Sequence, residues 1–195
     1  MAIDASYRAL PYDPLIKRAM NDRETAEALG FFRTMATDDI TKGPYHDDPL
    51  WLELVPIARD LVNTHPALLN RALSTRAWDA AYWMLAPNRR AQTDRNPHGL
   101  AEICVFGAEE FPCKAVSSVG IPLRLVRPNT AAAVAEYVEN ILDDAPALFD
   151  IEAMQAAHVY KPPRDRALFL SLLNDYARLY RQAAEANEWI LVTHD

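Results

Sequence analysis

Apolar residues recur at helical spacing through most of this chain, and the strongest pattern lies in the middle third. Four apolar residues there stand at positions i, i+3, i+4 and i+7, the stripe that a helix turns toward a core. They are Trp78, Ala81, Tyr82 and Leu85. Ser74 or Thr75 can cap the start of the helix, and Pro87 cannot continue it. The pattern predicts a central core helix over residues 73–86.

The first 70 residues are predicted to be mostly helical. Residues 3–10 alternate apolar and more polar positions, which indicates a short strand ahead of the helices. Residues 15–35 have helical spacing in two pieces, and Asn21 or Asp22 can cap the second piece. Another helix is expected to follow Asp48-Pro49, with apolar residues from Leu50 to Val62 on one broad face, and Pro56 should kink or split it.

The loop over residues 37–48 ends in His46, Asp47 and Asp48, three potential metal ligands in a row. Neighbouring residues on an extended chain rarely point at one ion, and no second cluster completes a site. Asp48 followed by Pro49 is therefore interpreted as a helix N-cap with proline at the first helical position.

Three later segments have the composition of strands. Residues 103–106 form a short apolar run before Gly107, residues 114–127 are the most β-like stretch, and residues 189–193 are aromatic and β-branched. Helices are expected between and after them. They begin at residue 128, cover residues 151–157, and run from residue 165 to about residue 185.

These elements predict the α+β class, a small mixed β-sheet covered by several helices. The strands are too far apart in sequence to form a run of hairpins. A single domain is expected over residues 1–195, with a mostly helical part at 1–70 and an α+β part at 73–193.

The net charge of −7 is unevenly distributed. Residues 1–70 carry −4, residues 71–128 carry +3 and residues 129–195 carry −6. An acidic chain without a Lys/Arg-rich run is a poor candidate for binding nucleic acid or an anionic membrane. Five glycines against fourteen prolines also argue against glycine-rich phosphate loops.

The two cysteines, Cys104 and Cys113, form no disulfide framework or paired zinc motif. Residues 1–5 lack the features of a signal peptide, and no apolar run reaches the ~20 residues that span a bilayer. A cytoplasmic location is the resulting expectation.

Several segments resemble the YfbM-like family, a bacterial domain of unknown function. The resemblance begins with the Trp78-Asp79 pair and its aromatic helix, and continues with Gly107 after an apolar segment. It extends through the Pro-Leu-Arg-Leu-Val-Arg-Pro segment at 122–128 and through residues 149–160. It covers residues 73–193 and is weaker in the first strand. Tyr82 stands where the family commonly has histidine, and Lys161 separates Tyr160 from Pro162. The resemblance implies a cytoplasmic α+β domain and brings no established reaction.

Asp79 and Arg124 are the charged residues that stand out, because each lies in an apolar context. A buried carboxylate needs a partner, and the arginine fork matches it. The functional interpretation is a binding pocket formed by Trp78, Asp79, Tyr82, Arg124 and Tyr160, with Arg124 offered to an anion. The structural interpretation, which we favour, is a core ion pair or a carboxylate that accepts backbone N–H groups.

Other chemistry finds little support in the sequence. The histidines His98, His158 and His194 are isolated, Cys104 lies in an apolar run, and Cys113 has no base partner. Nucleotide-binding and hydrolase motifs are absent. We therefore assign no catalytic residues, no metal ligands and no cofactor, and we lean against an enzyme.

Two hypotheses follow. The first is a non-enzymatic protein-binding module, an immunity- or antitoxin-like binder that uses acidic surface to hold a basic partner such as a toxin. The second is a small-molecule-binding protein or enzyme with the five-residue pocket named above. The sequence does not fix the oligomeric state.

Overall fold

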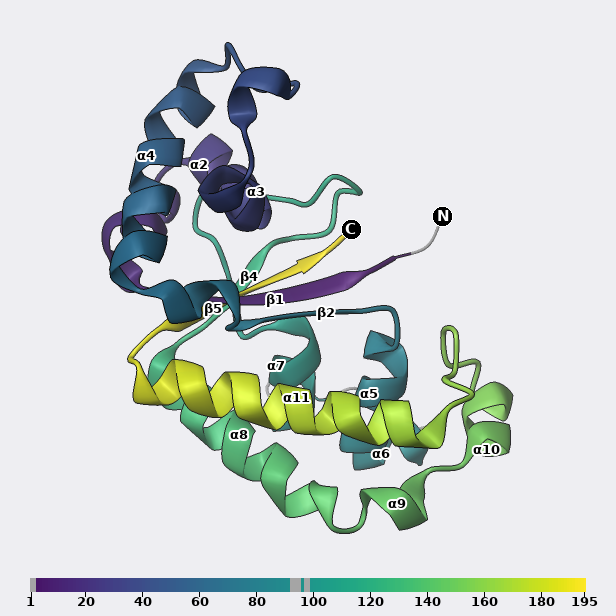
Figure 1. The fold of residues 1–195 in the computed structure, drawn as a ribbon. Coiled ribbons are helices and arrows are strands. Elements are labelled where there is room, and N and C mark those ends of the chain that lie inside the picture. Colours follow the sequence, from purple (N-terminus) through teal and green to yellow (C-terminus); the bar gives the residue numbers. More distant parts are fainter. Residues whose placement is uncertain (1–2, 92–95, 97–98) are drawn as a thin grey trace.

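The computed structural model describes residues 3–91, 96 and 99–195, and it contains a five-stranded sheet between two groups of helices (Figure 1). The strands are β1 (Ala5–Leu10), β2 (Ala72–Thr75), β3 (Glu109–Glu110), β4 (Arg124–Val126) and β5 (Trp189–His194). Their order is β2-β1-β5-β4-β3, and every pairing among them is antiparallel. The α+β class is confirmed, and the sheet is antiparallel where a mixed sheet was expected.

The helices come in two sequence groups. The first group lies between β1 and β2 and consists of short pieces around one long helix. Its members are η1 (Tyr12–Ile16), α1 (Lys17–Ala19), α2 (Arg23–Ala28), η2 (Leu29–Phe31), α3 (Phe32–Thr37), η3 (Ile40–Lys42), α4 (Pro49–Thr64) and η4 (Pro66–Leu69). The second group follows β2. Its members are α5 (Trp78–Leu85), α6 (Pro87–Arg90), α7 (Leu100–Phe106), α8 (Pro128–Leu142), α9 (Ala145–Leu148), α10 (Ile151–Ala156) and α11 (Arg166–Glu185).

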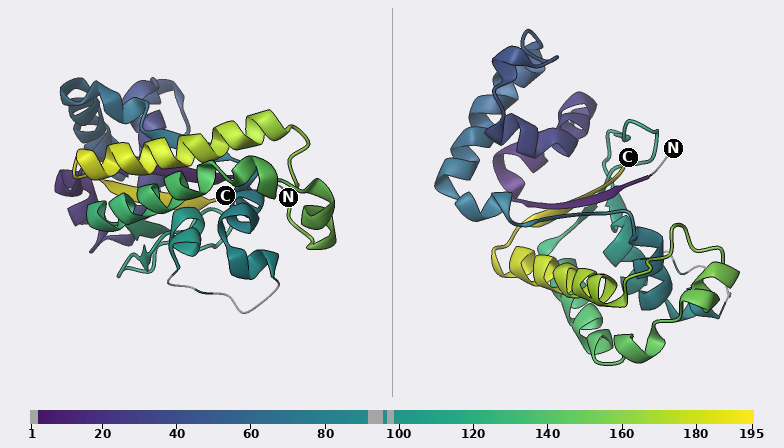
Figure 2. Two further views of the ribbon diagram at one scale, coloured as in Figure 1. Left: turned by 90° about the horizontal axis from the view of Figure 1, so that it is seen from below. Right: turned by 45° about the vertical axis from the view of Figure 1, so that its right-hand side comes forward.

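Each face of the sheet has its own hydrophobic core. Figures 1 and 2 show α2, α3 and α4 on one face, with α5, α7, α8 and α11 on the other. Strand β5 explains why both faces are apolar. Ile190 and Val192 pack into the core beneath α8 and α11, whereas Leu191 packs into the core with α2 and α4. Alternate strand residues point to opposite faces, so a continuous apolar strand serves two helical layers.

Local capping places several helices where the sequence predicts them. The Asp48 carboxylate accepts hydrogen bonds from the N–H groups of Leu50 and Trp51, at 2.9 and 3.2 Å, with Pro49 at the first helical position. The predicted N-cap is therefore confirmed. Asp22, one of the two predicted caps, accepts from the Glu24 N–H. Helix α4 runs from Pro49 to Thr64 without being split at Pro56.

The predicted central helix begins later than expected. Leu73 and its neighbours belong to strand β2, where Leu73 pairs with Tyr7 of β1, and helix α5 starts only at Trp78. Thr75 still makes the local bond that a cap makes, because its hydroxyl accepts from the Ala77 N–H at 3.0 Å. That bond closes the turn between β2 and α5.

The predicted strand over residues 103–106 is wrong, because these residues form the end of helix α7. The helix ends at Gly107, whose φ of +81° is the left-handed conformation that glycine adopts without strain. An added Cβ there would lie 2.6 Å from the Arg124 Cβ, so the helix end and β4 are in close contact.

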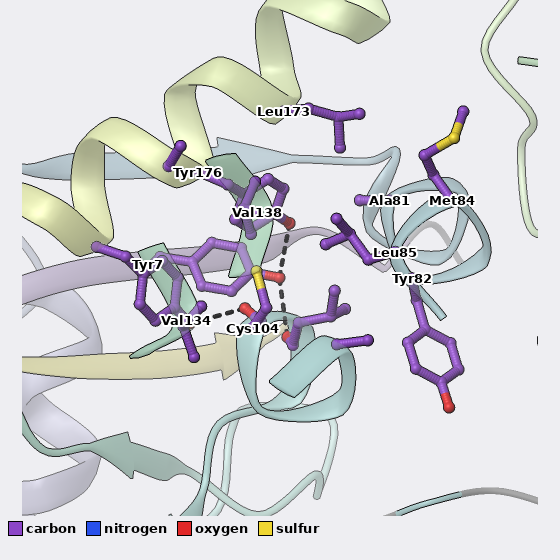
Figure 3. Packing of buried hydrophobic residues seen from close by; sticks show 14 of the residues in the cluster. Tyr7, Ala81, Tyr82, Met84, Leu85, Cys104, Val134, Val138, Leu173 and Tyr176 are labelled. Atoms are coloured by element: carbon purple, nitrogen blue, oxygen red, sulfur yellow. Dashed lines mark hydrogen bonds between the residues drawn. The ribbon is translucent and has the colours of Figure 1, made fainter. Parts of the chain in front are cut away.

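Buried tyrosines complete the hydrogen bonds at the end of α7. The last carbonyls of a helix have no partner within it. The Tyr7 hydroxyl donates to the Val105 carbonyl at 2.9 Å, and the Tyr180 hydroxyl donates to the Cys104 carbonyl at 2.7 Å. The Tyr176 hydroxyl in turn donates to the Tyr7 hydroxyl at 2.9 Å, as Figure 3 shows. Burial raises the pKa of all three hydroxyls well above its ordinary value.

The β-like stretch at 114–127 differs from expectation. Of its described residues only those of β4 form a strand, together with one bridge between Val116 and Pro122. Residues 87–90 form α6, and residues 92–95 and 97–98, including His98, lie outside the described residues. Arg89 and Arg90 donate to the carbonyls of Ala157 and Met84, so these two arginines hold the chain together.

Candidate functional site

Three of the five predicted pocket residues, Trp78, Tyr82 and Tyr160, lie in one aromatic cluster. Trp78, the first residue of α5, stacks on Tyr160 with ring centres 5.8 Å apart. It also meets the edges of Phe106 and His194 at 5.7 and 5.4 Å. Tyr82, one helical turn after Trp78, contacts Phe106 at 5.1 Å. The cluster therefore joins α5, the end of α7, the end of β5 and the segment after α10.

The polar tips of this cluster bind the chain just before β1. The Trp78 indole N–H donates to the Ile3 carbonyl, and the Ile3 N–H donates to the Tyr160 hydroxyl, both at 3.1 Å. A tryptophan or tyrosine that is largely buried needs a partner for its polar atom. Here the partner is backbone of the same chain, so these rings fix the position of the segment leading into β1.

Asp79 is also held by the chain itself. Its Oδ2 accepts a hydrogen bond from the Tyr160 N–H at 2.7 Å, and the Arg89 guanidinium lies 3.9 Å away. The side chain is only 13% exposed. A carboxylate accepting a backbone N–H is one of the two forms of the structural interpretation given above.

Arg124 does not pair with Asp79. It lies on β4 and donates to Glu110 of β3 at 3.1 Å. Glu110 is its direct cross-strand neighbour in the β3–β4 register, and such opposite-charge pairs stabilise a sheet. The core ion pair between Asp79 and Arg124 is therefore not formed.

His194 belongs to this cluster and was missed as a candidate. It is the last residue of β5, is 5% exposed, and stacks on Phe106 at 5.5 Å. Within the described residues its Nε2 has no hydrogen-bond partner. Burial, with the positive charge of Arg124 adding to it, lowers the pKa of His194 to about 4. The β-branched run just before His194 was the signal that could have placed it in the sheet.

One of the cavities in the described structure is lined by a residue of the predicted pocket. Tyr82 lines a space of about 270 Å³ together with Tyr137 and parts of α6 and α7, and neither Asp79 nor Arg124 lines it. A small-molecule site built on these residues would need a cleft that Asp79 and Arg124 both line. The binding roles of the five residues remain a prediction.

No three His, Cys, Asp or Glu side chains in the described ranges are grouped so that they could hold a metal ion. Asp48 of the His46-Asp47-Asp48 run is used as the cap of α4. Cys104 is fully buried, and burial raises the pKa of its thiol. Cys113 donates from its Sγ to the Ala19 carbonyl at 3.2 Å.

An acidic surface covers helices α8, α9 and α10. Residues 128–160 contain six carboxylates and no lysine or arginine, and all six acidic side chains are exposed. They are Glu136, Glu139, Asp143, Asp144, Asp150 and Glu152. Glu139 pairs with Arg181 of α11, and Asp150 caps α10 by accepting from the Ala153 N–H. Within the described part of the chain the other four have no ion-pair partner. Figure 1 places these helices at the opposite end of the molecule from α2–α4.

The fold defines an α+β protein in which two helical layers enclose an antiparallel sheet, and the acidic helices α8–α10 form one edge of the molecule. A solved structure with this architecture is that of YfbM from Escherichia coli, a protein of unknown function. The two structures match with a TM-score of 0.52 over 97% of this chain and 98% of that chain, at 14% sequence identity. The fold is therefore YfbM-like, and the match extends beyond residues 73–193 into the helical N-terminal part.

The comparisons with sequences add nothing to this, because no family model and no curated protein matches the chain. Among the described helices none is both long and apolar enough to cross a membrane.

Proposed function

We propose that this protein is a protein-binding module that holds a basic partner protein on the acidic surface of α8–α10, as an immunity protein or antitoxin holds a toxin. The observation that carries the proposal is the charge of residues 128–160, six exposed carboxylates without one lysine or arginine. Glu136, Asp143, Asp144 and Glu152 lack an ion-pair partner in the described structure, so their charge is available to another molecule.

Part of the acidic charge on the opposite face of the sheet is paired. Glu53 pairs with Arg18 and Glu27 pairs with Arg23, whereas Glu24 and Asp60 have no ion pair in the described structure. Exposed pairs of this kind neutralise each other locally and add little to stability.

Arg181 pairs with Glu139 on the acidic surface of α8–α10, and Arg166 and Arg89 donate to the carbonyls of Pro146 and Ala157 there. The exposed carboxylates that have no ion pair can speed and orient the approach of a positively charged protein.

The test starts with a partner captured from the source cells, identified, and purified separately. The variant Glu136→Lys, Asp143→Lys, Asp144→Lys changes the acidic surface by six charge units. A matched control, Glu24→Lys, Asp47→Lys, Asp60→Lys, makes the same change at exposed positions in α2, before α4 and within α4. We expect the first variant to slow association about tenfold or more, and the control to slow it much less.

Salt provides an independent measurement. The Debye length falls from about 10 Å at 0.1 M to about 3 Å at 1 M salt, so association through exposed charges should slow steeply over that range. A partner with no net positive charge, or one that binds the two variants equally well, would refute the proposal.

The alternative, a small-molecule-binding protein or enzyme with a pocket at Trp78, Asp79, Tyr82, Arg124 and Tyr160, has less support. The polar atoms of Trp78, Asp79 and Tyr160 are already bonded to the chain's own backbone. One observation speaks for the alternative, the buried Nε2 of His194. A ligand that stabilises the wild type against heat but not the Arg124→Ala variant would favour this alternative.

A further inference from the structure

Strand β2 is an edge of the sheet with free backbone groups. In the order β2-β1-β5-β4-β3, β1 is the only described strand that pairs with it. The Ala9 N–H donates to the Arg71 carbonyl, so residue 71 faces β1 with its backbone polar groups. In an antiparallel pair every second residue does so, and residues 73 and 75 are the next two in this series. These residues therefore bond to β1, whereas the N–H and C=O groups of Ala72 and Ser74 point away from the sheet. Such an edge is a template for another strand.

A groove runs alongside this edge. It has a volume of about 540 Å³ and lies between residues 73–77 of β2 and the turn after it, and residues 163–175 around the first half of α11. Its apolar lining includes Leu73, Phe169, Leu172 and Leu168. Leu168 is 71% exposed, more than any other large apolar side chain in the described structure. A groove between an edge strand and a helix is the arrangement in which proteins bind an extended peptide as an added strand.

One end of the groove carries the available charge. Arg76 follows the last residue of β2 and Arg164 precedes the start of α11, and both line the groove. In Figure 1 the end of β2 and the start of α11 lie on the same side of the molecule. Arg76 already donates to Asp4. Of the acidic residues of the lining, Asp175 pairs with Arg178, and Asp165 keeps its charge while it caps α11 by accepting from the Leu168 N–H. Arg164 has no ion pair within the described part of the chain, so its guanidinium is available to a carboxylate of a ligand.

We infer that this groove binds an extended peptide segment of another protein, which adds to β2 as a sixth strand. The segment's main chain pairs with Ala72 and Ser74, an apolar side chain packs against Leu168, Phe169 and Leu172, and a nearby carboxylate meets Arg164. The inference goes beyond the proposed function, because it concerns another surface and a ligand of the opposite charge.

The experiment selects random peptides displayed on phage against the immobilised protein and measures the enriched peptides by fluorescence anisotropy. We expect a shared pattern of an apolar residue beside an acidic one. Leu168→Asp should weaken binding at least about tenfold, equivalent to about 1.4 kcal/mol. Leu52→Asp is the matched control, because Leu52 is an exposed leucine (52%) on α4, and it should leave binding unchanged.

Two further variants test the backbone and the charge. Ser74→Pro removes an N–H that faces away from the sheet, a position where edge strands tolerate proline, so the melting temperature should hold while binding is lost. Arg164→Glu should change the preference of selected peptides from acidic to basic. The Glu136, Asp143, Asp144 variant should bind the peptides normally, which separates this site from the acidic surface.

Three results would overturn the inference. One is a selection that enriches no peptide. Another is enriched peptides that bind equally well to the Leu168→Asp and Ser74→Pro proteins. The third is a wild-type dimer that becomes a monomer in Leu168→Asp during analytical ultracentrifugation, which would make a second copy of this chain the occupant.

Discussion

Replacing the buried tyrosines near the end of α7 by phenylalanine should lower the free energy of unfolding by different amounts. The hydrogen bonds that each hydroxyl makes determine the order. Tyr7 both donates to the Val105 carbonyl and accepts from Tyr176. Tyr7→Phe therefore leaves two buried polar groups without partners. Each buried unsatisfied group costs about 1–3 kcal/mol, so we expect a loss of about 3 kcal/mol in the free energy of unfolding. Tyr180→Phe leaves only the Cys104 carbonyl unpaired, with an expected loss of about 2 kcal/mol.

Tyr176→Phe should be the mildest change. It removes a donor to the Tyr7 oxygen, but Tyr7 still donates to Val105, so no carbonyl is left unpaired. We expect a loss of about 1 kcal/mol. Tyr7→Phe leaves the Tyr176 hydroxyl without its acceptor, and in the double variant of Tyr7 and Tyr176 that hydroxyl is absent as well. The loss of unfolding free energy in the double variant should therefore be smaller than the sum of the two single losses.

Urea unfolding followed by circular dichroism gives these free energies, with Tyr12→Phe as the control because Tyr12 is 38% exposed. Equal losses for all three tyrosines, or strictly additive losses in the double variant, would falsify the bonding order.

The same tyrosines make stability depend on alkaline pH. Their pKa values are raised in the folded protein, whereas tyrosines of the unfolded chain ionise near pH 10. Above that pH the unfolded chain has released protons that the folded protein retains. Stability should therefore be fully present below about pH 10 and should fall as the pH rises further.

Three other predictions concern the sheet and the aromatic cluster. The pKa of His194 is lowered to about 4, so between about pH 6.5 and pH 4 only the unfolded chain gains this proton, and stability should fall as the pH falls through that range. Denaturant titrations at a series of pH values should show this fall in the wild type and not in His194→Phe. Gly107→Ala should cost about 2 kcal/mol or more by thermal unfolding, because φ is +81° and the Cβ would clash, whereas Gly30→Ala has room and should cost less than 1 kcal/mol. Asp79→Ala removes a buried acceptor and should lower the free energy of unfolding by about 1–2 kcal/mol, whereas Arg124→Ala should lower it by less than about 1 kcal/mol. A larger loss for Arg124→Ala than for Asp79→Ala in urea titrations would contradict the assigned hydrogen bonds.

Features that depend on neighbouring residues could be predicted from the sequence. The caps at Asp48 and Asp22 need only a carboxylate two or three residues before the N–H groups that it accepts from. The aromatic grouping of Trp78 and Tyr82 likewise follows from helical spacing. These predictions describe contacts within about one helical turn.

Features that depend on distant residues could not be predicted. Residues 103–106 are apolar on every side, and a short apolar run fits a buried strand or a buried helix equally well. The helix is completed by Tyr7 and Tyr180, whose positions in the sequence carry no sign of that contact. Leu73 was assigned to a helix for a similar reason, because its strand is defined by pairing with Tyr7, 66 residues earlier.

The partner of Arg124 shows how the same limit affects a functional hypothesis. Asp79 and Arg124 suggested each other because both are charged residues in apolar surroundings. The structure gives Arg124 a carboxylate from the adjacent strand β3, and gives Asp79 a backbone N–H from the segment after α10. Both bonds connect elements that a pattern along the chain does not relate. Charge that is already bonded within the fold argues for stability, and charge without a partner argues for binding. By this criterion the acidic surface of α8–α10 and Arg164 beside β2 are the places where a partner should be sought.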